Sequence, residues 1–194
     1  MFILFVALLA PFFSSFANII ECKLSNNIFK HPATMIFYIS LMNCLFMPLL
    51  LFFGIPTLPA PGAVPFYFLL AFIDVAYLYP YYKAMKVIDT SIVSALFSLG
   101  QITIPIMTYL FLDERLRESQ YAGFLLIIAA SIVLSINDFK MPKLNRAFYY
   151  MVFVSLLRAF YVVLQKYTFK EDDNWINLII YVNIFSFLLP IVYK

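Results

Sequence analysis

The sequence predicts an all-α polytopic membrane protein, a bundle of helices. Of its 194 residues, 64% are hydrophobic and 12% charged, whereas soluble domains have about 45–50% apolar and about 25% charged residues. The apolar residues form continuous runs, unlike the short alternating strands of a membrane barrel. Charges and Pro/Gly clusters separate these runs. Since a helix satisfies its backbone hydrogen bonds internally, continuous apolar runs in lipid are expected to be helical.

Seven apolar segments follow one another with short connections. Each is close to the roughly 20 residues that a spanning helix needs, so no separate soluble domain fits. The first segment carries no basic residue before Lys23, and a signal peptide should begin with one, so we expect a span there. The predicted helices are 1–20, 33–53, 64–82, 91–112, 120–136, 147–164 and 175–193.

Charge and motif content exclude several functional classes. The net charge of +3 is typical of loop lysines that orient a membrane protein and does not indicate a nucleic-acid partner. Cys22 and Cys44 lack the spacing of a metal site, and His31 is the only histidine. No HExxH, GxSxG, Walker or Rossmann pattern is present. We therefore predict no enzyme activity, no cofactor and no metal.

Two charges fall inside predicted spans. Asp74 lies on one face of the third segment with Tyr77, and Arg158 lies near the centre of the sixth with Tyr161 one turn on. A mid-membrane charge costs at least about 2.5 kcal/mol, so each needs compensation. Three explanations remain open: a structural ion pair, a coupling carboxylate with an independent substrate-binding arginine, or two solvated cavity residues. We expect Asp74 and Arg158 to face each other, because a neutral Asp74 would leave Arg158 uncompensated.

Polar and small residues also follow one face of the fourth segment. Their spacing of three and four residues suits either a close-packing seam between membrane helices or the lining of a cavity. Gln101 favours the lining, because a mid-span amide needs a hydrogen-bond partner or water. The stripe consists of Ser91, Ser94, Ser98, Gln101, Pro105 and Thr108.

The chain carries a weak internal repeat. A shift of 143 residues places Lys166 over Lys23 and Tyr181 over Tyr38. We expect a first unit over residues 1–140 and the start of a second over 145–194. With five helices per unit, the second unit would be inverted relative to the first, as in many secondary transporters.

One stretch resembles a known family. The run YLYPYYKAMKVIDTSIVSALFSLGQITIPIMTYLFLDERLRESQYAGFLLIIAASIVLSI is similar to the EamA-type domain of the drug/metabolite transporter superfamily. Gln101 stands where the family usually has a proline, and Ala130 replaces a glycine of the fifth helix. The residues that carry the resemblance are Ala84, Ser91, Glu114, Arg115, Gln120 and Gly123.

The resemblance implies ten helices in two inverted five-helix units around a central substrate cavity. About seven of the ten would be present here, and roughly 90 further residues would be needed for the others. The implied location is a bacterial inner (plasma) membrane.

We therefore predict a secondary active transporter of a small polar or amphipathic metabolite that works by alternating access, with the proton as its candidate coupling ion. Its expected partners are that solute and the lipid bilayer. The alternative is a non-transporting membrane scaffold or assembly subunit, whose polar stripes only hold helices together. The predicted substrate-binding or coupling residues are Asp74, Tyr77, Ser94, Ser98, Gln101, Arg158 and Tyr161.

Overall fold

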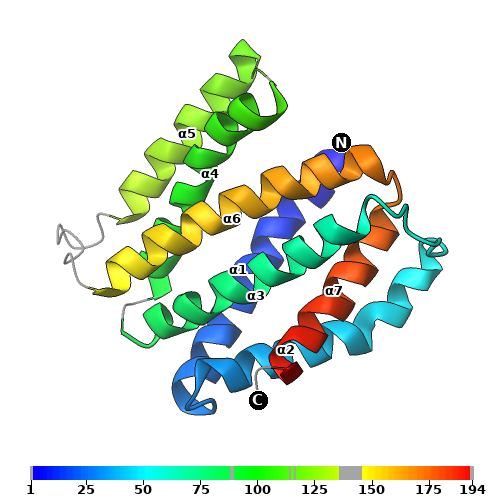
Figure 1. The fold of residues 1–194 in the computed structure, drawn as a ribbon. Helices are drawn as coiled ribbons and strands as arrows, with labels where there is room; N and C mark the ends of the chain where they lie inside the picture. Colours follow the sequence, from blue (N-terminus) through cyan, green and yellow to red (C-terminus); the bar gives the residue numbers. More distant parts are fainter. Residues whose placement is uncertain (1, 88–89, 114, 116, 136–145, 193–194) are drawn as a thin grey trace.

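The computed structural model describes residues 2–87, 90–113, 115, 117–135 and 146–192, and in this part of the chain the fold is a helical bundle (Figure 1). Seven α-helices and one short 3₁₀ helix follow one another. They are α1 (Phe2–Asn27), α2 (Pro32–Phe46), η1 (Met47–Phe52), α3 (Val64–Met85), α4 (Thr90–Leu112), α5 (Glu118–Ser135), α6 (Arg146–Glu171) and α7 (Trp175–Val192).

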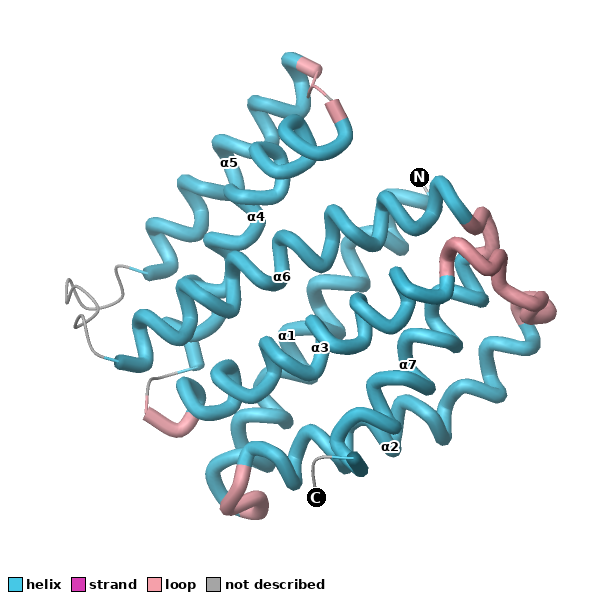
Figure 2. Tube along the Cα trace, viewed as in Figure 1, coloured by secondary structure: helices cyan, strands magenta, loops and turns pink. Residues whose placement is uncertain are grey.

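Helix α6 lies at the centre of the arrangement. It packs on α3 on one side and on α4 on the other, while α7 packs on α2 and α3 and α5 packs on α4 (Figure 2). One end of the bundle, here called the distal end, holds the loop before α3, the α4–α5 connection and the α6–α7 turn. The two polar clusters described below lie near the bundle centre and at this distal end.

Proline interrupts the second predicted helix. The sequence pattern predicts one helix over 33–53, but α2 ends at Phe46 and the chain continues as η1. Pro48 has no backbone N–H and cannot donate to the carbonyl four residues earlier, which breaks the α-helical pattern. The Met47 N–H instead bonds to the Cys44 carbonyl three residues back, as a 3₁₀ helix requires.

Two helices are longer than the hydrophobic pattern predicts. Helix α1 continues to Asn27 instead of stopping near residue 20, and α6 continues to Glu171 instead of residue 164. At about 1.5 Å per residue, a helix of 26 residues measures roughly 39 Å, more than the hydrocarbon core of about 30 Å. The added turns carry polar residues that suit the headgroup region.

A close contact joins α4 to α6. A Cβ built on Gly100 would lie 2.8 Å from the Ser155 carbonyl oxygen, so only glycine allows this approach. The Ser155 hydroxyl also donates to the Leu96 carbonyl at 2.7 Å. Small residues and a buried hydroxyl are the usual means by which membrane helices associate.

Three helical segments in the described part are long and apolar enough to cross a membrane. They are Pro32–Phe52, Val64–Met85 and Arg146–Glu171. Thr103–Leu112 and Trp175–Pro190 are shorter apolar helices. The all-helical prediction is confirmed, and these helices have the length and composition of a multi-pass membrane protein.

Candidate functional site

A cluster of polar side chains lies where α3, α6 and α7 meet. Asp74 and Tyr77 come from α3, Arg158 and Tyr161 from α6, and Ser186 from α7. We call these five residues the charge cluster. Residues three apart lie on the same helical face, which explains why each helix contributes its charge and its tyrosine together.

Tyrosine rings flank the guanidinium of Arg158. Its Cζ atom lies 4.9 Å from the ring centroid of Tyr161 and 5.6 Å from that of Tyr77. Both distances fall within the range of cation–π attraction. Arg158 Nη1 also donates to the Tyr77 hydroxyl at 3.4 Å, a long hydrogen bond. The guanidinium is therefore held mainly by aromatic faces.

Asp74 and Arg158 both interact with Tyr77, which lies close to the two charges. The Tyr77 hydroxyl interacts with the Asp74 carboxylate, and the carboxylate also feels the charge of Arg158. Among the described residues the two charges form no direct ion pair within 4.0 Å. The buried Ser186 hydroxyl lies close to the same carboxylate but has no partner of good hydrogen-bond geometry.

The charge cluster sits between two hydrophobic clusters. Tyr77 belongs to the cluster built around Met85 and Met151, and Tyr161 to the one around Leu70 and Leu178. Leu157, the neighbour of Arg158, packs against both. A cation with a nearby carboxylate in apolar surroundings can bind an anionic or zwitterionic group, because a low local dielectric strengthens the attraction.

The structure brings together four of the seven predicted site residues. Asp74, Tyr77, Arg158 and Tyr161 converge, whereas the side chains of Ser94, Ser98 and Gln101 on α4 lie outside the described residues. Sequence reasoning missed Ser186. A single serine in the apolar α7 gives little signal, because small polar residues are common at helix contacts in membranes.

A second polar group, at the distal end, ties a loop to α7. Asn177 is fully buried, and its Oδ1 accepts from the Thr57 backbone N–H at 2.8 Å. Its Nδ2 donates to Thr57 Oγ1 at 2.9 Å and to Asp172 Oδ2 at 3.0 Å. The Tyr67 hydroxyl donates to the same Asp172 oxygen at 2.7 Å. We call Thr57, Tyr67, Asp172 and Asn177 the distal clasp.

The start of α7 supports the distal clasp. Asn174 Oδ1 accepts from the Ile176 N–H at 3.0 Å, as an N-cap side chain does. The Asn174 N–H in turn donates to Asp172 Oδ1 at 3.1 Å. Burial tends to raise the pKa of Asp172, but the hydrogen bonds from Asn177, Tyr67 and two backbone N–H groups outweigh it, so its pKa lies below the usual value.

The distal clasp was missed at the level of sequence. Asp172 reads as an ordinary loop charge, and Thr57 lies in a Pro/Gly-rich connection. The available signal was Asn177, an amide within an apolar run. Its partners lie in other elements and could not be assigned without the fold.

A half-buried carboxylate on α1 also escaped the sequence analysis. Glu21 Oε2 accepts a hydrogen bond from the Tyr82 hydroxyl of α3 at 3.2 Å. It follows an apolar run and immediately precedes Cys22 and Lys23. The sequence alone therefore suggested a solvated position at a helix end.

Comparison with known proteins places the chain in a family. The model of the EamA-like transporter family matches residues 1–136, and no curated protein matches the chain. The match confirms the resemblance carried by residues 77–136 and agrees with the predicted absence of enzyme activity, since the family is one of transporters. It covers well over half of the chain, so this protein belongs to the EamA-like transporter family.

Proposed function

We propose that this chain moves a small polar or amphipathic organic solute by alternating access, and that an anionic group of the solute binds Arg158. The observation that carries the proposal is the setting of the guanidinium: two tyrosine rings flank it, and no carboxylate contacts it directly among the described residues. A substrate carboxylate can make the short charge-assisted hydrogen bonds that Tyr77, at 3.4 Å, does not.

Asp74 has two roles in this proposal. With the site empty, its negative charge compensates the buried guanidinium, which stays protonated in every state. When substrate binds, the two anions compete for Arg158, and Asp74 either moves away or takes up a proton. The second route would couple transport to protons, because a desolvated carboxylate without a cationic partner favours its neutral form.

The inverted-repeat arrangement remains part of the proposal. On this view residues 1–140 form one unit and 145–194 begin the next, so that α6 and α7 would be the counterparts of α1 and α2. The shift of 143 residues that pairs Lys166 with Lys23 supports the assignment. Substrate sites of such transporters lie where the repeats meet, and α6 packs directly on α3 of the first unit.

A transport assay on the purified chain tests the function. Proteoliposomes are incubated with a defined mixture of amino acids, organic acids and nucleosides, and their contents are measured by mass spectrometry. We expect at least one solute with an anionic or zwitterionic group to accumulate above empty vesicles, and Arg158→Ala to abolish that accumulation.

Two outcomes contradict the proposal. If the folded wild-type chain accumulates none of these solutes, the non-transporting scaffold becomes the better interpretation. If Arg158→Ala transports like the wild type, the chain is a transporter but its substrate does not bind at the charge cluster. Circular dichroism on both proteins separates either result from a failure to fold.

A further inference from the structure

The loop before α3, residues 53–63, exposes large apolar side chains. Phe53, Ile55 and Leu58 of the loop, and Phe52 at the end of η1, are between 74% and 93% exposed. We call these four residues the apolar rim. Figure 1 shows the loop at the distal end, beside the orange turn between α6 and α7. Contiguous exposed apolar residues often mark a surface that binds a partner or a membrane.

The sequence around the apolar rim carries no charge. From His31 to Ile73, which includes α2, η1, the loop and the first part of α3, there is no Asp, Glu, Lys or Arg. The neighbouring α6–α7 connection differs, because Lys170, Glu171 and Asp173 lie in or beside it and are exposed. Two connections at the same end of the bundle therefore suit different surroundings: one suits water, and the other an apolar medium.

The backbone N–H groups of the loop are partly satisfied by the distal clasp. The Thr57 N–H donates to Asn177 Oδ1 at 2.8 Å, and the Ala60 N–H donates to the Asp172 carboxylate. Prolines remove further donors, because a proline has no backbone N–H. The loop contains Pro56, Pro59 and Pro61.

Two backbone carbonyls of the loop also have partners on or next to α7. The Thr57 carbonyl accepts from the Tyr181 hydroxyl at 3.2 Å, and Asn174 Nδ2 reaches the Ile55 carbonyl at 3.4 Å. A Cβ built on Gly54 would collide with the Ile176 side chain, so the loop lies tightly against the start of α7. Irregular backbone is tolerated at membrane depth only where the protein satisfies its polar groups. The polar groups of the loop thus face the protein, while its apolar side chains face outward.

The apolar rim continues the exposed apolar surface of two membrane-spanning segments. Pro32–Phe52 and Val64–Met85 are long and apolar enough to cross a membrane, and they flank the loop on either side. Leu49 on the first and Phe68 on the second are exposed. Trp175, also exposed, begins α7 next to the loop, and tryptophan is enriched where a membrane meets water. The loop therefore lies at the level of the membrane interface.

We propose that the loop before α3 is inserted into the membrane interface, with the apolar rim among the upper acyl chains of the lipids. An apolar face held in this way lies about 5–10 Å deep, at the boundary of headgroups and acyl chains. The distal clasp keeps the polar backbone groups of the loop on the protein side. This inference uses no residue of the charge cluster, and it holds whether or not the chain transports the solute class proposed above.

Lipid suits the apolar rim better than water or a protein partner. In water, the rim would leave four large apolar side chains hydrated, which is unfavourable. A protein partner would need a surface complementary to side chains that protrude as far as Leu58 does. Fluid acyl chains adapt to such side chains and already border the two flanking spans.

Electron paramagnetic resonance on the purified chain in phosphatidylcholine vesicles tests the insertion. The native thiols are removed by Cys22→Ser and Cys44→Ser. A nitroxide spin label is then attached through Leu58→Cys or Ile55→Cys in the apolar rim, or through Asp173→Cys in the α6–α7 connection as the matched control. Power saturation measures how often the label collides with O₂, which concentrates in hydrocarbon, and with a water-soluble nickel chelate present on both sides of the membrane.

We expect the ratio of O₂ collisions to nickel collisions at positions 55 and 58 to be at least about threefold that at position 173, because a label in the acyl region is shielded from water. Circular dichroism verifies that each labelled variant is folded. The two rim positions are independent, so a folding failure of one leaves the other to answer.

Two results would overturn the insertion. If the nickel chelate reaches the rim labels as readily as the label at position 173, the loop lies in water. If both reagents collide rarely with the rim labels, a protein surface covers the loop, for example a second copy of this chain. Neither result would bear on the role of Arg158, which the uptake assay measures separately.

Discussion

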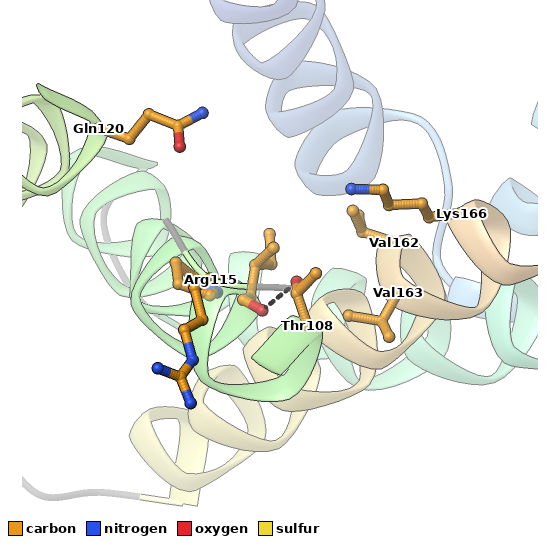
Figure 3. A pocket seen from close by; sticks show the side chains of 8 residues that line it. Thr108, Arg115, Gln120, Val162, Val163 and Lys166 are labelled. Atoms are coloured by element: carbon orange, nitrogen blue, oxygen red, sulfur yellow. Dashed lines mark hydrogen bonds between the residues drawn. The ribbon is translucent and has the colours of Figure 1, made fainter. Parts of the chain in front are cut away.

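The two sides of α6 differ at the distal end of the bundle. Toward α3 and α7, Asp172 accepts hydrogen bonds from Tyr67 and Asn177, and the distal clasp closes the space between the helices. Toward α4 and α5, α6 instead borders a cavity of about 470 Å³, which Thr108, Gln120, Val163 and Lys166 help to line (Figure 3). One helix thus borders a closed polar network on one side and a cationic opening on the other.

The difference shows how polar groups are satisfied in a membrane helix bundle. In the distal clasp the Thr57 N–H, the Tyr67 hydroxyl and the Asn177 amide all find acceptors within the chain, which joins the loop before α3 to α7. Beside the cavity, two cationic side chains come from different elements and the lining offers no carboxylate. Closure of the distal clasp therefore follows from complementary partners within the chain.

The largest expected effect is on the inner side of α6, at Arg158. Arg158→Ala leaves Asp74 as a buried charge without its cation, a loss of about 3–5 kcal/mol when such partners are separated. We expect transport to fall by about 100-fold or more, because the anionic group of the solute loses its cation; this factor corresponds to about 2.7 kcal/mol at about 1.36 kcal/mol for each factor of ten. Uptake into proteoliposomes measures this loss of transport.

The double variant Arg158→Ala with Asp74→Asn should restore part of the stability but not the transport. Equal stability of the single and double variants would contradict an interaction between Asp74 and Arg158.

The next effect concerns the contact from which α4 and α6 diverge. Gly100→Ala places a Cβ 2.8 Å from the Ser155 carbonyl oxygen, and we expect the free energy of unfolding in detergent to fall by about 1–3 kcal/mol. Gly123→Ala on α5 is the matched control, because its Cβ would meet nothing within 4 Å. It should raise stability by up to about 1 kcal/mol through helix propensity. Equal effects of the two substitutions would show that α4 and α6 are not in close contact.

A smaller effect is expected when the distal clasp is opened. Asn177→Ala removes the acceptor of the Thr57 N–H and one of the hydrogen bonds to Asp172, and should cost about 1–3 kcal/mol. Its signature is faster hydrogen exchange at the Thr57 amide, measured by mass spectrometry on peptides from 53–63. Asn183→Ala is the control on the same helix, since Asn183 Nδ2 bonds only to the Ile179 carbonyl of its own helix. Unchanged exchange at Thr57 in Asn177→Ala would show that the clasp does not hold the loop.

The smallest effect is the pH dependence of the distal clasp. The pKa of Asp172 lies below its usual value of 3.8 in the folded protein. Its contribution to stability is therefore complete above the unfolded pKa and disappears as the pH falls through the folded one. We expect the difference in unfolding midpoint between wild type and Asp172→Asn to be constant from pH 7 to about 5 and to vanish in stronger acid. Asp173→Asn is the control, because Asp173 is the exposed neighbour of Asp172. A difference in unfolding midpoint between wild type and Asp172→Asn that persists at about pH 2 would contradict a lowered pKa of Asp172.

Local patterns were enough to identify the helices and part of the candidate site. Hydropathy predicted seven helical segments, and the structure describes seven α-helices in those places. The periodicity of a single helix placed Asp74 with Tyr77 and Arg158 with Tyr161, and these pairs do meet. The exception was the 33–53 segment, where the hydropathy was uniform and the missing N–H of Pro48 determined where α2 ends.

Contacts between helices were beyond the reach of sequence patterns. That Ser186 would lie beside Asp74, or that Asn177 would hold Thr57, depends on how α7 is placed against α3 and against the loop before it. That Tyr77 of α3 would also reach Arg158 of α6 depends on the same packing between helices.

Composition thus specifies a membrane-embedded helical chain, because backbone groups buried in lipid must form hydrogen bonds within their own helix. Periodicity specifies which residues share one face of each helix, because the 3.6-residue turn relates positions that are close in sequence. The charge cluster, the distal clasp and the cavity between α4, α5 and α6 depend on where helices approach and where they separate. The distances between helices follow from packing between residues remote in sequence, such as Gly100 against Ser155. Because Gly100 has no Cβ, α4 and α6 can approach closely at this point. The distance at this contact in turn influences how wide the space between the two helices is further along.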